Sequence, residues 1–297
     1  MNAMENAPAS RTAPRPNASF ARMPRALRLH AVTLPVPDLP AAEKFYRWVL
    51  GMKASAEDVE EGIVSLGWGK EDRVILADAE AKAGAREAIG IRIEAEEPVE
   101  FAARLAETGL IPTRLVTHRD DIDEMGEVWP EADLVPEEDP AWANRYVVGL
   151  EAPADIRVDL HVPFPAATVV ARGRQGPFYR RTKEWQGLEN PGLLGVTLGA
   201  TAVAELGAFF ESLGIAPMPA EAAESDAPLL VGDHQVRIER RDPPGLYGTA
   251  FVVAASRLPD LVRTLERFGA PHKLEKNHLL AVDPAGRILA VNGVRAG

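Results

Sequence analysis

The chain has 297 residues, with 33 Lys and Arg against 44 Asp and Glu, which gives a formal net charge of −11. This balance argues against a general nucleic-acid binder, and the lack of cysteine excludes disulfides, zinc–thiolate sites, iron–sulfur clusters and a thiol nucleophile. No apolar stretch approaches the roughly 18 residues that cross a bilayer, and no apolar segment near the N-terminus resembles a secretory signal. We therefore expect a cytoplasmic protein with neither a nucleic-acid nor a membrane partner.

The first 28 residues differ in composition from the rest of the chain. They are rich in Ala, Pro and Arg, contain a single acidic residue, Glu5, and show no apolar period. Such a segment cannot bury enough apolar surface to fold, so we expect residues 1–28 to form a disordered tail. A targeting peptide, or an arm that binds an acidic partner, is the alternative.

The first folded unit is predicted to be a strand, a helix and three further strands. Residues 31–36 alternate in the manner typical of a strand, and Pro37 ends it. Asp38 is placed to cap a helix that has an apolar stripe and ends at Gly51. The three short strand candidates that follow cover residues 52–59, 62–68 and 72–78.

The same unit recurs three more times. New strands begin near Ile89, Gly195 and Thr249, and each is followed by a helix with matching apolar positions. These helices end at glycines: Gly109, Gly214 and Gly269. Because both the apolar positions and the glycines repeat, we expect four copies of one βαβββ module. The expected domains are a first domain over 29–165 (modules 1 and 2), a basic linker over 166–189, and a second domain over 190–297 (modules 3 and 4).

The second module contains a long acidic insertion over residues 119–143. It is rich in Asp and Glu and also carries Trp129 and Trp142. A segment of this length inside a compact domain is usually either disordered or a lid over a binding site. Indole rings are uncommon in freely solvated loops, so the two tryptophans favour a lid.

A family resemblance is carried by the segment that leads into the first helix. His30 to Leu39 reads HAVTLPVPDL and is followed by Phe45-Tyr46 and Leu50-Gly51. With the four tandem modules, this pattern resembles the vicinal oxygen chelate (VOC) superfamily, the group of glyoxalases, bleomycin-resistance proteins and extradiol dioxygenases. The resemblance implies an α+β fold in which the modules pair into two incomplete β-barrels with the helices outside. It also implies a cavity in each barrel, where a divalent metal is usually held by His on first strands and Glu on last strands.

Most of the metal-ligand positions that the resemblance implies hold other residues. Seven residues before Asp38, where the superfamily has its first His, stands Ala31. His30 is one residue away and would face the helix, unless a bulge at residues 35–37 brings it back into phase. The equivalent positions of the other modules cannot bind a metal: Ala88, Gly195 and Gly248.

On the closing strands, the expected Glu is replaced by Asp159 in the first domain and by Ala290 in the second. A tight transition-metal site needs about three or four protein ligands, which these positions do not supply. We therefore expect no cofactor. A divalent metal is the alternative, and it would use His30, Asp159 and His161.

Strand alternation predicts a polar cluster inside the first barrel. Arg92 would face inward, and the neighbouring closing strand would present three inward side chains: Arg157, Asp159 and His161. In one interpretation Arg92 and Asp159 form a structural ion pair. In the other, an arginine binds a ligand oxygen while His161, oriented by Asp159, serves as a general acid or base. The other predicted ligand contacts are Thr33, Arg157 and Trp129.

The leading functional hypothesis is a VOC/glyoxalase-like protein, monomeric or homodimeric, that binds a small organic molecule in a barrel cavity and has largely lost its metal site. The acidic surface would favour a cationic ligand, and a carbonyl-containing ligand is the alternative. The enzymatic alternatives are a metal-dependent lyase, an extradiol-type dioxygenase, or a metal-free isomerase that uses Arg92 and His161. A purely structural or interaction protein is the third hypothesis.

Overall fold

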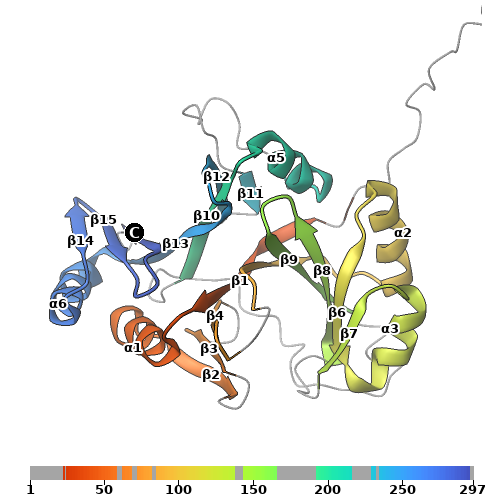
Figure 1. Ribbon diagram of the computed structural model, residues 1–297, viewed down its shortest axis with the longest axis horizontal. Helices are drawn as coiled ribbons and strands as arrows, with labels where there is room; N and C mark the ends of the chain where they lie inside the picture. The colour runs from red at the N-terminus through yellow and green to blue at the C-terminus, as the bar shows by residue number, and fades with distance from the viewer. Residues whose placement is uncertain are drawn as a thin grey trace, which may run out of the picture.

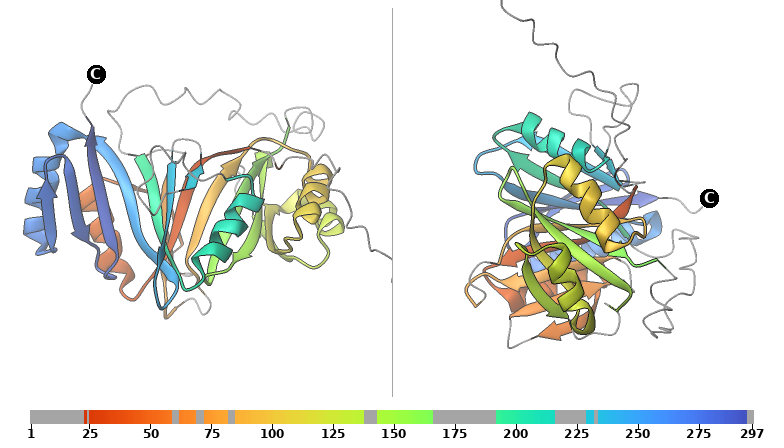
Figure 2. Two further views of the ribbon diagram at one scale, coloured as in Figure 1. Left: turned by 90° about the horizontal axis from the view of Figure 1, so that it is seen from above. Right: turned by 90° about the vertical axis from the view of Figure 1, so that its right-hand side faces the viewer.

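The computed structural model describes residues 23, 25–58, 62–68, 72–81, 85–137, 143–165, 192–215, 229–231 and 234–294. Over these ranges the chain forms two β-sheets, and helices cover one face of each sheet (Figure 1). Each sheet is strongly curved but is not closed into a barrel within the described residues (Figure 2). The predicted α+β class is confirmed.

Nine of the described strands form the first sheet. Their order across the sheet is β2 (Lys53–Asp58), β3 (Ile63–Gly67), β4 (Arg73–Asp78), β1 (Ala26–Val36), β5 (Ala88–Ile93), β9 (Ile156–Pro163), β8 (Arg145–Ala152), β6 (Pro112–His118) and β7 (Asp133–Glu137). In each module the first strand runs parallel to the last, β1 beside β4 and β5 beside β9. The antiparallel pair of β1 and β5 joins the two modules, as predicted for an incomplete barrel.

The second sheet repeats this arrangement. Its order is β11 (Leu229–Val231), β12 (His234–Arg240), β10 (Gly192–Ala200), β13 (Gly245–Ala254), β16 (Ile288–Val294), β15 (His278–Val282) and β14 (His272–Glu275). Strands β10 and β12 are parallel, as are β13 and β16, and the antiparallel pair of β10 and β13 joins the two halves.

Each module has one helix of ten or more residues: α1 (Leu39–Leu50), α2 (Pro98–Thr108), α5 (Val203–Ser212) and α6 (Leu258–Phe268). The short helix η5 (Ala255–Arg257) precedes α6. Helix α1 begins where the Asp38 side chain accepts a 2.9 Å hydrogen bond from the Ala41 N–H, and it ends at Gly51, whose φ of 69° is readily adopted by glycine. None of the described helices is long and apolar enough to cross a membrane.

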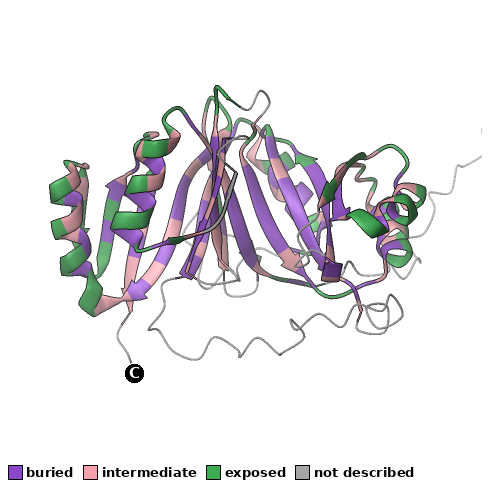
Figure 3. Ribbon diagram, turned by 90° about the horizontal axis from the view of Figure 1, so that it is seen from below, coloured by how far each residue is buried: buried purple, intermediate pink, exposed green. Residues whose placement is uncertain are grey.

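The two sheets share one continuous apolar core on their helix-covered sides. Phe45 of α1 lies edge-on to Phe268 of α6, with ring centroids 6.1 Å apart. The buried Tyr46 hydroxyl donates a 2.9 Å hydrogen bond to the Asp283 carboxylate, in the turn before β16. Figure 3 shows the buried residues concentrated along the strands and on the sheet-facing sides of the helices. The two halves are therefore fixed to one another by apolar packing and by a buried polar contact.

Strand β1 begins earlier than predicted. The Arg25 N–H donates to the Glu94 side chain at 3.2 Å, and Ala26 pairs with Ile93 of β5. Residues 26–28 therefore belong to the sheet and not to the predicted tail of residues 1–28, because β5 extends far enough to pair with them. Residues 1–22 and the predicted linker over 166–189 lie outside the described residues.

The acidic insertion is folded over residues 119–137, so the prediction of a disordered loop or lid is wrong there. The short helix η1 (Arg119–Asp121) leads into α3 (Ile122–Val128), and β7 then extends the sheet beside β6. Met125 of α3 is buried, which explains the helix: its acidic residues occupy the outer face while the apolar ones pack inward. Trp142 lies outside the described residues.

Trp129, which follows α3, is 7% exposed and belongs to the core. Its ring lies 5.8 Å from the Tyr146 ring and 6.4 Å from the Phe101 ring of α2. The indole thus packs on the helix-covered face of the sheet. Its apolar area, and not a ligand, explains why a tryptophan stands in this acidic segment.

Replacement of Trp129 by Ala should lower the free energy of unfolding by about 3–5 kcal/mol, because it empties a large buried volume. Trp48→Ala is the matched control: this side chain is 68% exposed, and its loss should change stability by about 0.5 kcal/mol or less. Urea unfolding of both variants measures the difference. Equal, small effects would show that the segment does not pack on the core.

Candidate functional site

Most of the predicted site residues lie on the concave face of the first sheet, which points away from the helices. Ile89, Ile91 and Ile93 of β5 are buried in the core, so Arg92, which alternates with them, points to the opposite face. The same alternation and the strand register identify the other side chains of this face: Ala31, Thr33, Arg73, Arg145, Arg157, Asp159 and His161.

A β-bulge in β1 places His30 on this face. Leu29 pairs with Ile91 and Ala31 pairs with Gly90, so His30 is an extra residue on β1. The His30 ring lies against the His161 ring, with centroids 4.7 Å apart, and His30 is 3% exposed. The expectation that His30 faces the helix is therefore wrong. The alternative required a bulge, and one is present, but at residues 29–31 instead of 35–37.

The two imidazoles are closely surrounded. Nη1 of Arg145 lies 3.5 Å from Nε2 of His30, and Arg92 stands in register with His161 across the β5–β9 pair. Gly90 gives the His161 ring its space, because a Cβ there would approach His161 Nε2 to 3.0 Å and the Ala31 Cβ to 3.1 Å. Contact between the two rings therefore favours a residue without a side chain at position 90.

Positive charge surrounds both imidazoles. Burial is the main cause that holds the pKa of His30 well below its usual value, and four arginines lower it further. Burial also lowers the pKa of His161 strongly, with additional contributions from His30 and from three of the same arginines. Both histidines are therefore neutral at pH 7. We call these four residues the arginine cluster: Arg28, Arg73, Arg92 and Arg145.

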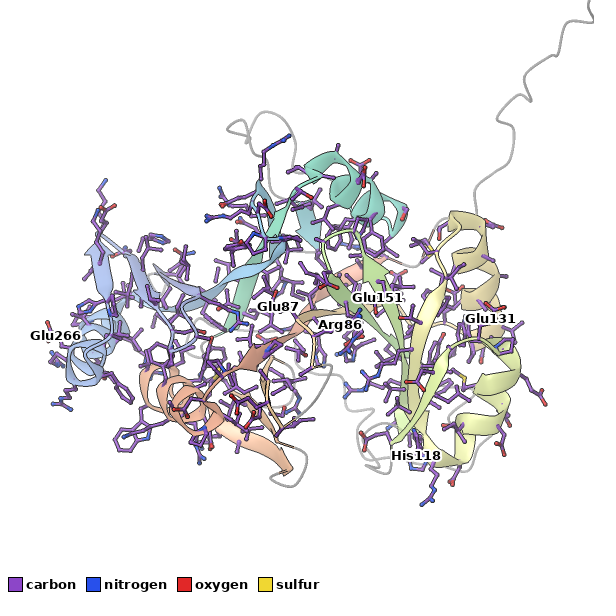
Figure 4. All side chains as sticks on the ribbon, in the orientation of Figure 1. Arg86, Glu87, His118, Glu131, Glu151 and Glu266 are labelled. Carbon is purple, nitrogen blue, oxygen red and sulfur yellow. The ribbon has the colours of Figure 1, made fainter. Side chains whose placement is uncertain are left out.

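Asp159 pairs with a different arginine from the one predicted. Its Oδ1 accepts a 2.8 Å hydrogen bond from Nε of Arg157, and its Oδ2 accepts one of 3.0 Å from Nη2 of the same residue. The expected Arg92–Asp159 pair is wrong, because Arg157 is two positions away on the same strand and face, whereas Arg92 is in register with His161. A further ion pair of 2.9 Å joins Arg86 to Glu151 near this face (Figure 4).

The remaining predicted ligand contacts separate into two groups. Thr33 is half-buried on the concave face, between Ile75 and Ala88 in the register. Arg157 lies on the same face, although its guanidinium is bound to Asp159. Trp129 is on the opposite, helix-covered face, so its predicted role as a ligand contact is wrong.

Arg28 and Arg145 of the arginine cluster were not predicted to lie on this face. Arg28 was assigned to the tail, and no partner strand was predicted for it. Arg145 stands at the first position of β8, two residues before Val147, which is in register with His161. The alternation along β8 could therefore have placed Arg145 on the concave face.

The residues of this face do not fit a divalent metal. His30 and His161 supply two imidazoles, but Asp159, the third predicted ligand, is held at both oxygens by Arg157. The arginine cluster would repel a cation. Among the described residues, no three His, Asp or Glu side chains come together in a way that could hold a metal ion.

In the second sheet, the positions that correspond to a first-strand metal ligand are Gly195 and Gly248, and the backbone of the adjacent strand leaves little or no space for a side chain there. A Cβ at Gly195 would lie 2.5 Å from the carbonyl oxygen of Gln235 on the adjacent strand. At Gly248, a Cβ would lie 3.0 Å from the carbonyl oxygen of Ile288. A histidine at Gly195 would therefore require the strands to move apart.

A cleft of about 480 Å³ lies between the two halves, and none of the predicted site residues is among the residues that line it. Glu87 and Arg287 line it and are joined by a 2.9 Å ion pair, and the second Glu87 oxygen accepts a hydrogen bond from the Leu246 N–H. Their polar atoms hold the two halves together. The concave face of the first sheet, with its buried histidines, is therefore the better candidate for chemistry.

Comparison with known proteins agrees with this architecture. Residues 28–119 match the model of the Glyoxalase/Bleomycin resistance protein/Dioxygenase superfamily, whereas no curated protein matches the chain. The VOC resemblance is therefore confirmed over residues 28–119.

Solved structures show the same two-domain fold over nearly the whole chain. A catechol 2,3-dioxygenase has a TM-score of 0.61 and 16% identity, covering 92% of this chain and 90% of that one. Homoprotocatechuate 2,3-dioxygenase from Brevibacterium fuscum, in complex with 3,4-dihydroxyphenylacetate, has a TM-score of 0.60 and 15% identity, covering 95% and 84%. The 2,3-dioxygenase LapB from Pseudomonas sp. KL28 has a TM-score of 0.58 and 16% identity, covering 94% and 95%. The chain thus has the fold of the extradiol dioxygenases.

The lowered pKa values of the two histidines predict how stability depends on pH. An unfolded histidine binds a proton below about pH 6.5, while the folded chain resists protonation at His30 and His161. The free energy of unfolding should therefore fall as the pH drops below about 6.5, by up to about 1.4 kcal/mol per pH unit for each histidine.

Urea unfolding between pH 8 and pH 5 checks this dependence. His30→Gln should reduce the slope, whereas His278→Gln, at an exposed position, should leave it unchanged. The same slope in wild type and His30→Gln would contradict the assignment of His30 as a buried neutral group.

A double-mutant cycle tests the partner of Asp159. Asp159→Asn and Arg157→Gln should be coupled by about 1–2 kcal/mol, because two charge-assisted hydrogen bonds are lost together. The control cycle of Asp159→Asn with Arg92→Gln should show a clearly smaller coupling. A larger coupling with Arg92 would restore the pair predicted from the sequence.

Proposed function

We propose that this chain binds a small organic molecule on the concave face of its first sheet, and that its action does not depend on a bound transition metal. The observation that carries the proposal is the contact between His30 and His161 inside the arginine cluster. A metal site at this place would need at least one further ligand beside the two histidines, and negative or neutral surroundings. The residues present instead supply neutral imidazoles and guanidinium groups.

A ligand could reach this face from solvent. Thr33, Arg73, Arg92 and Arg145 are all half-buried, so each presents part of its side chain at the surface. The structural neighbours support a small organic ligand, since one of them is a complex with 3,4-dihydroxyphenylacetate. At the observed identity this support is an analogy at the level of the fold.

A metal-free isomerase is the second candidate. Arg92 stands in register with His161, and a neutral imidazole can accept a proton from carbon beside a carbonyl group while a guanidinium stabilises the resulting oxyanion. A metal-dependent lyase or extradiol-type dioxygenase would need ligands that the described strands do not present. A cytoplasmic location and a monomeric or homodimeric state stay predictions.

A fragment screen by ligand-observed NMR tests the binding proposal. A set containing neutral, anionic and cationic aromatic molecules should give binders that Thr33→Trp abolishes, because the indole would fill the concave face. Thr197→Trp is the matched control, since Thr197 occupies the equivalent position beside Arg237 in the second sheet and is also half-buried. Circular dichroism checks that both variants fold, and Ile75→Trp, beside Thr33 in the register, is the second blocking variant.

Two results would overturn the proposal. One is binding that survives Thr33→Trp and Ile75→Trp but is lost in Thr197→Trp, which would assign the ligand to the second sheet. The other is elemental analysis that finds about one transition metal per chain, lost in His30→Gln. The isomerase would be favoured if the wild-type protein, but not His161→Gln, catalyses deuterium exchange at the carbon beside the carbonyl group of an added ketone.

A further inference from the structure

We infer that the ligand of the first concave face is an organic carboxylate, received by the arginine cluster where metal-dependent relatives would hold a cation. This inference rests on the proposed function and adds the sign of the ligand's charge and its chemical class. It reverses the expectation of a cationic ligand, which came from the net charge of the whole chain.

The first argument is the position of the guanidinium groups. Arg73 is in register with Ala31, the residue after His30, and Arg92 is in register with both His161 and Arg28. Arg145 reaches the other side of the histidine pair, 3.5 Å from His30. The four arginines of the cluster therefore come from four different strands, β1, β4, β5 and β8, around the histidine pair. Guanidinium groups bind carboxylates through paired hydrogen bonds.

The second argument is a buried hydrogen-bond donor on His30. Nε2 of His30 faces a guanidinium, which can only donate, so Nε2 is the acceptor and the proton of the neutral ring is on Nδ1. Nδ1 is buried and has no hydrogen-bond partner among the described residues. Buried donors are nearly always satisfied, and a ligand oxygen would supply the acceptor.

The third argument is that local charge outweighs the net charge of the chain. Charges further away than about 8–10 Å are largely screened at physiological ionic strength, so acidic residues elsewhere on the surface contribute little here. Among the described residues, two carboxylates near this face are already engaged, Asp159 with Arg157 and Asp72 with Arg28. A cation on this face would meet the arginine cluster without an available carboxylate from these two residues.

Isothermal titration calorimetry with three matched probes tests the inference on the full chain. Benzoate, benzamide and benzylammonium have similar size and differ in charge. Benzoate should bind at least about tenfold more tightly than benzamide, since one charge-assisted hydrogen bond accounts for such a ratio. Benzylammonium should give no measurable heat, and added NaCl should weaken benzoate but not benzamide.

Variants assign the effect to the arginine cluster. Arg92→Gln and Arg145→Gln should each weaken benzoate about tenfold or more and leave benzamide unchanged. Arg237→Gln, an exposed arginine on the concave face of the second sheet, is the matched control and should change nothing. The salt dependence of wild type gives a readout that does not require either variant to fold.

The outcomes separate this inference from the proposed function. If neutral fragments bind and Thr33→Trp abolishes them, but benzoate binds no better than benzamide, the inference fails while the proposed function stands. Tighter binding of benzylammonium would overturn the sign of the charge. If no probe and no fragment binds, both fail.

Discussion

The antiparallel pairing of β1 with β5 is the constraint on which the rest of the first half depends. It joins two modules into one curved sheet and brings their closing strands to either side of the centre. The pairing shifts register at two places, between Ala26 and Arg28 and between Leu29 and Ala31, and at the second of these His30 is an extra residue on β1. The second shift turns an imidazole from the core toward the concave face, where it lies close to His161 and the arginine cluster. Without the bulge, the strand alternation would leave this face with one histidine instead of two.

The two halves of the chain share a fold but differ in what their concave faces can do. In the first half, small residues leave room for rings, and Gly90 permits the contact between His30 and His161. In the second half, Gly195 lies so close to the Gln235 backbone that there is no space for a side chain at position 195. Glycine thus leaves room for the His161 ring in the first sheet, whereas in the second sheet it is required because the adjacent backbone leaves no room for a side chain. This difference explains why a pair of imidazoles is in contact in the first sheet, whereas a side chain at position 195 of the second sheet would meet the neighbouring backbone.

The fold could be predicted because it follows from repeated local features: alternating strands, an apolar helix stripe and a glycine at each helix end. The arrangement of the site residues could not be predicted from these repeated features, because it depends on a β-bulge and on which of two arginines pairs with Asp159. A bulge shifts a strand by one residue without any change in composition, so His30 was placed on the wrong face. The partner of Asp159 was missed because an arginine on the same strand competes with one across the sheet. Trp129 was misplaced because acidic residues around it suggested solvent, although Met125 and its apolar neighbours have the spacing of a buried helix face.

The contact of Tyr46 with Asp283 has a consequence for the evolutionary history of such a chain. The side chains that join the halves, among them Phe45 and Phe268, are part of one core and would be exposed in either half alone. A half-length ancestor with these residues would have been unstable unless a second copy covered them. Duplication and fusion of such a self-associating half would convert a symmetric dimer into one chain. Each copy could then change its concave face while keeping the apolar core that the two halves share on their helix-covered sides.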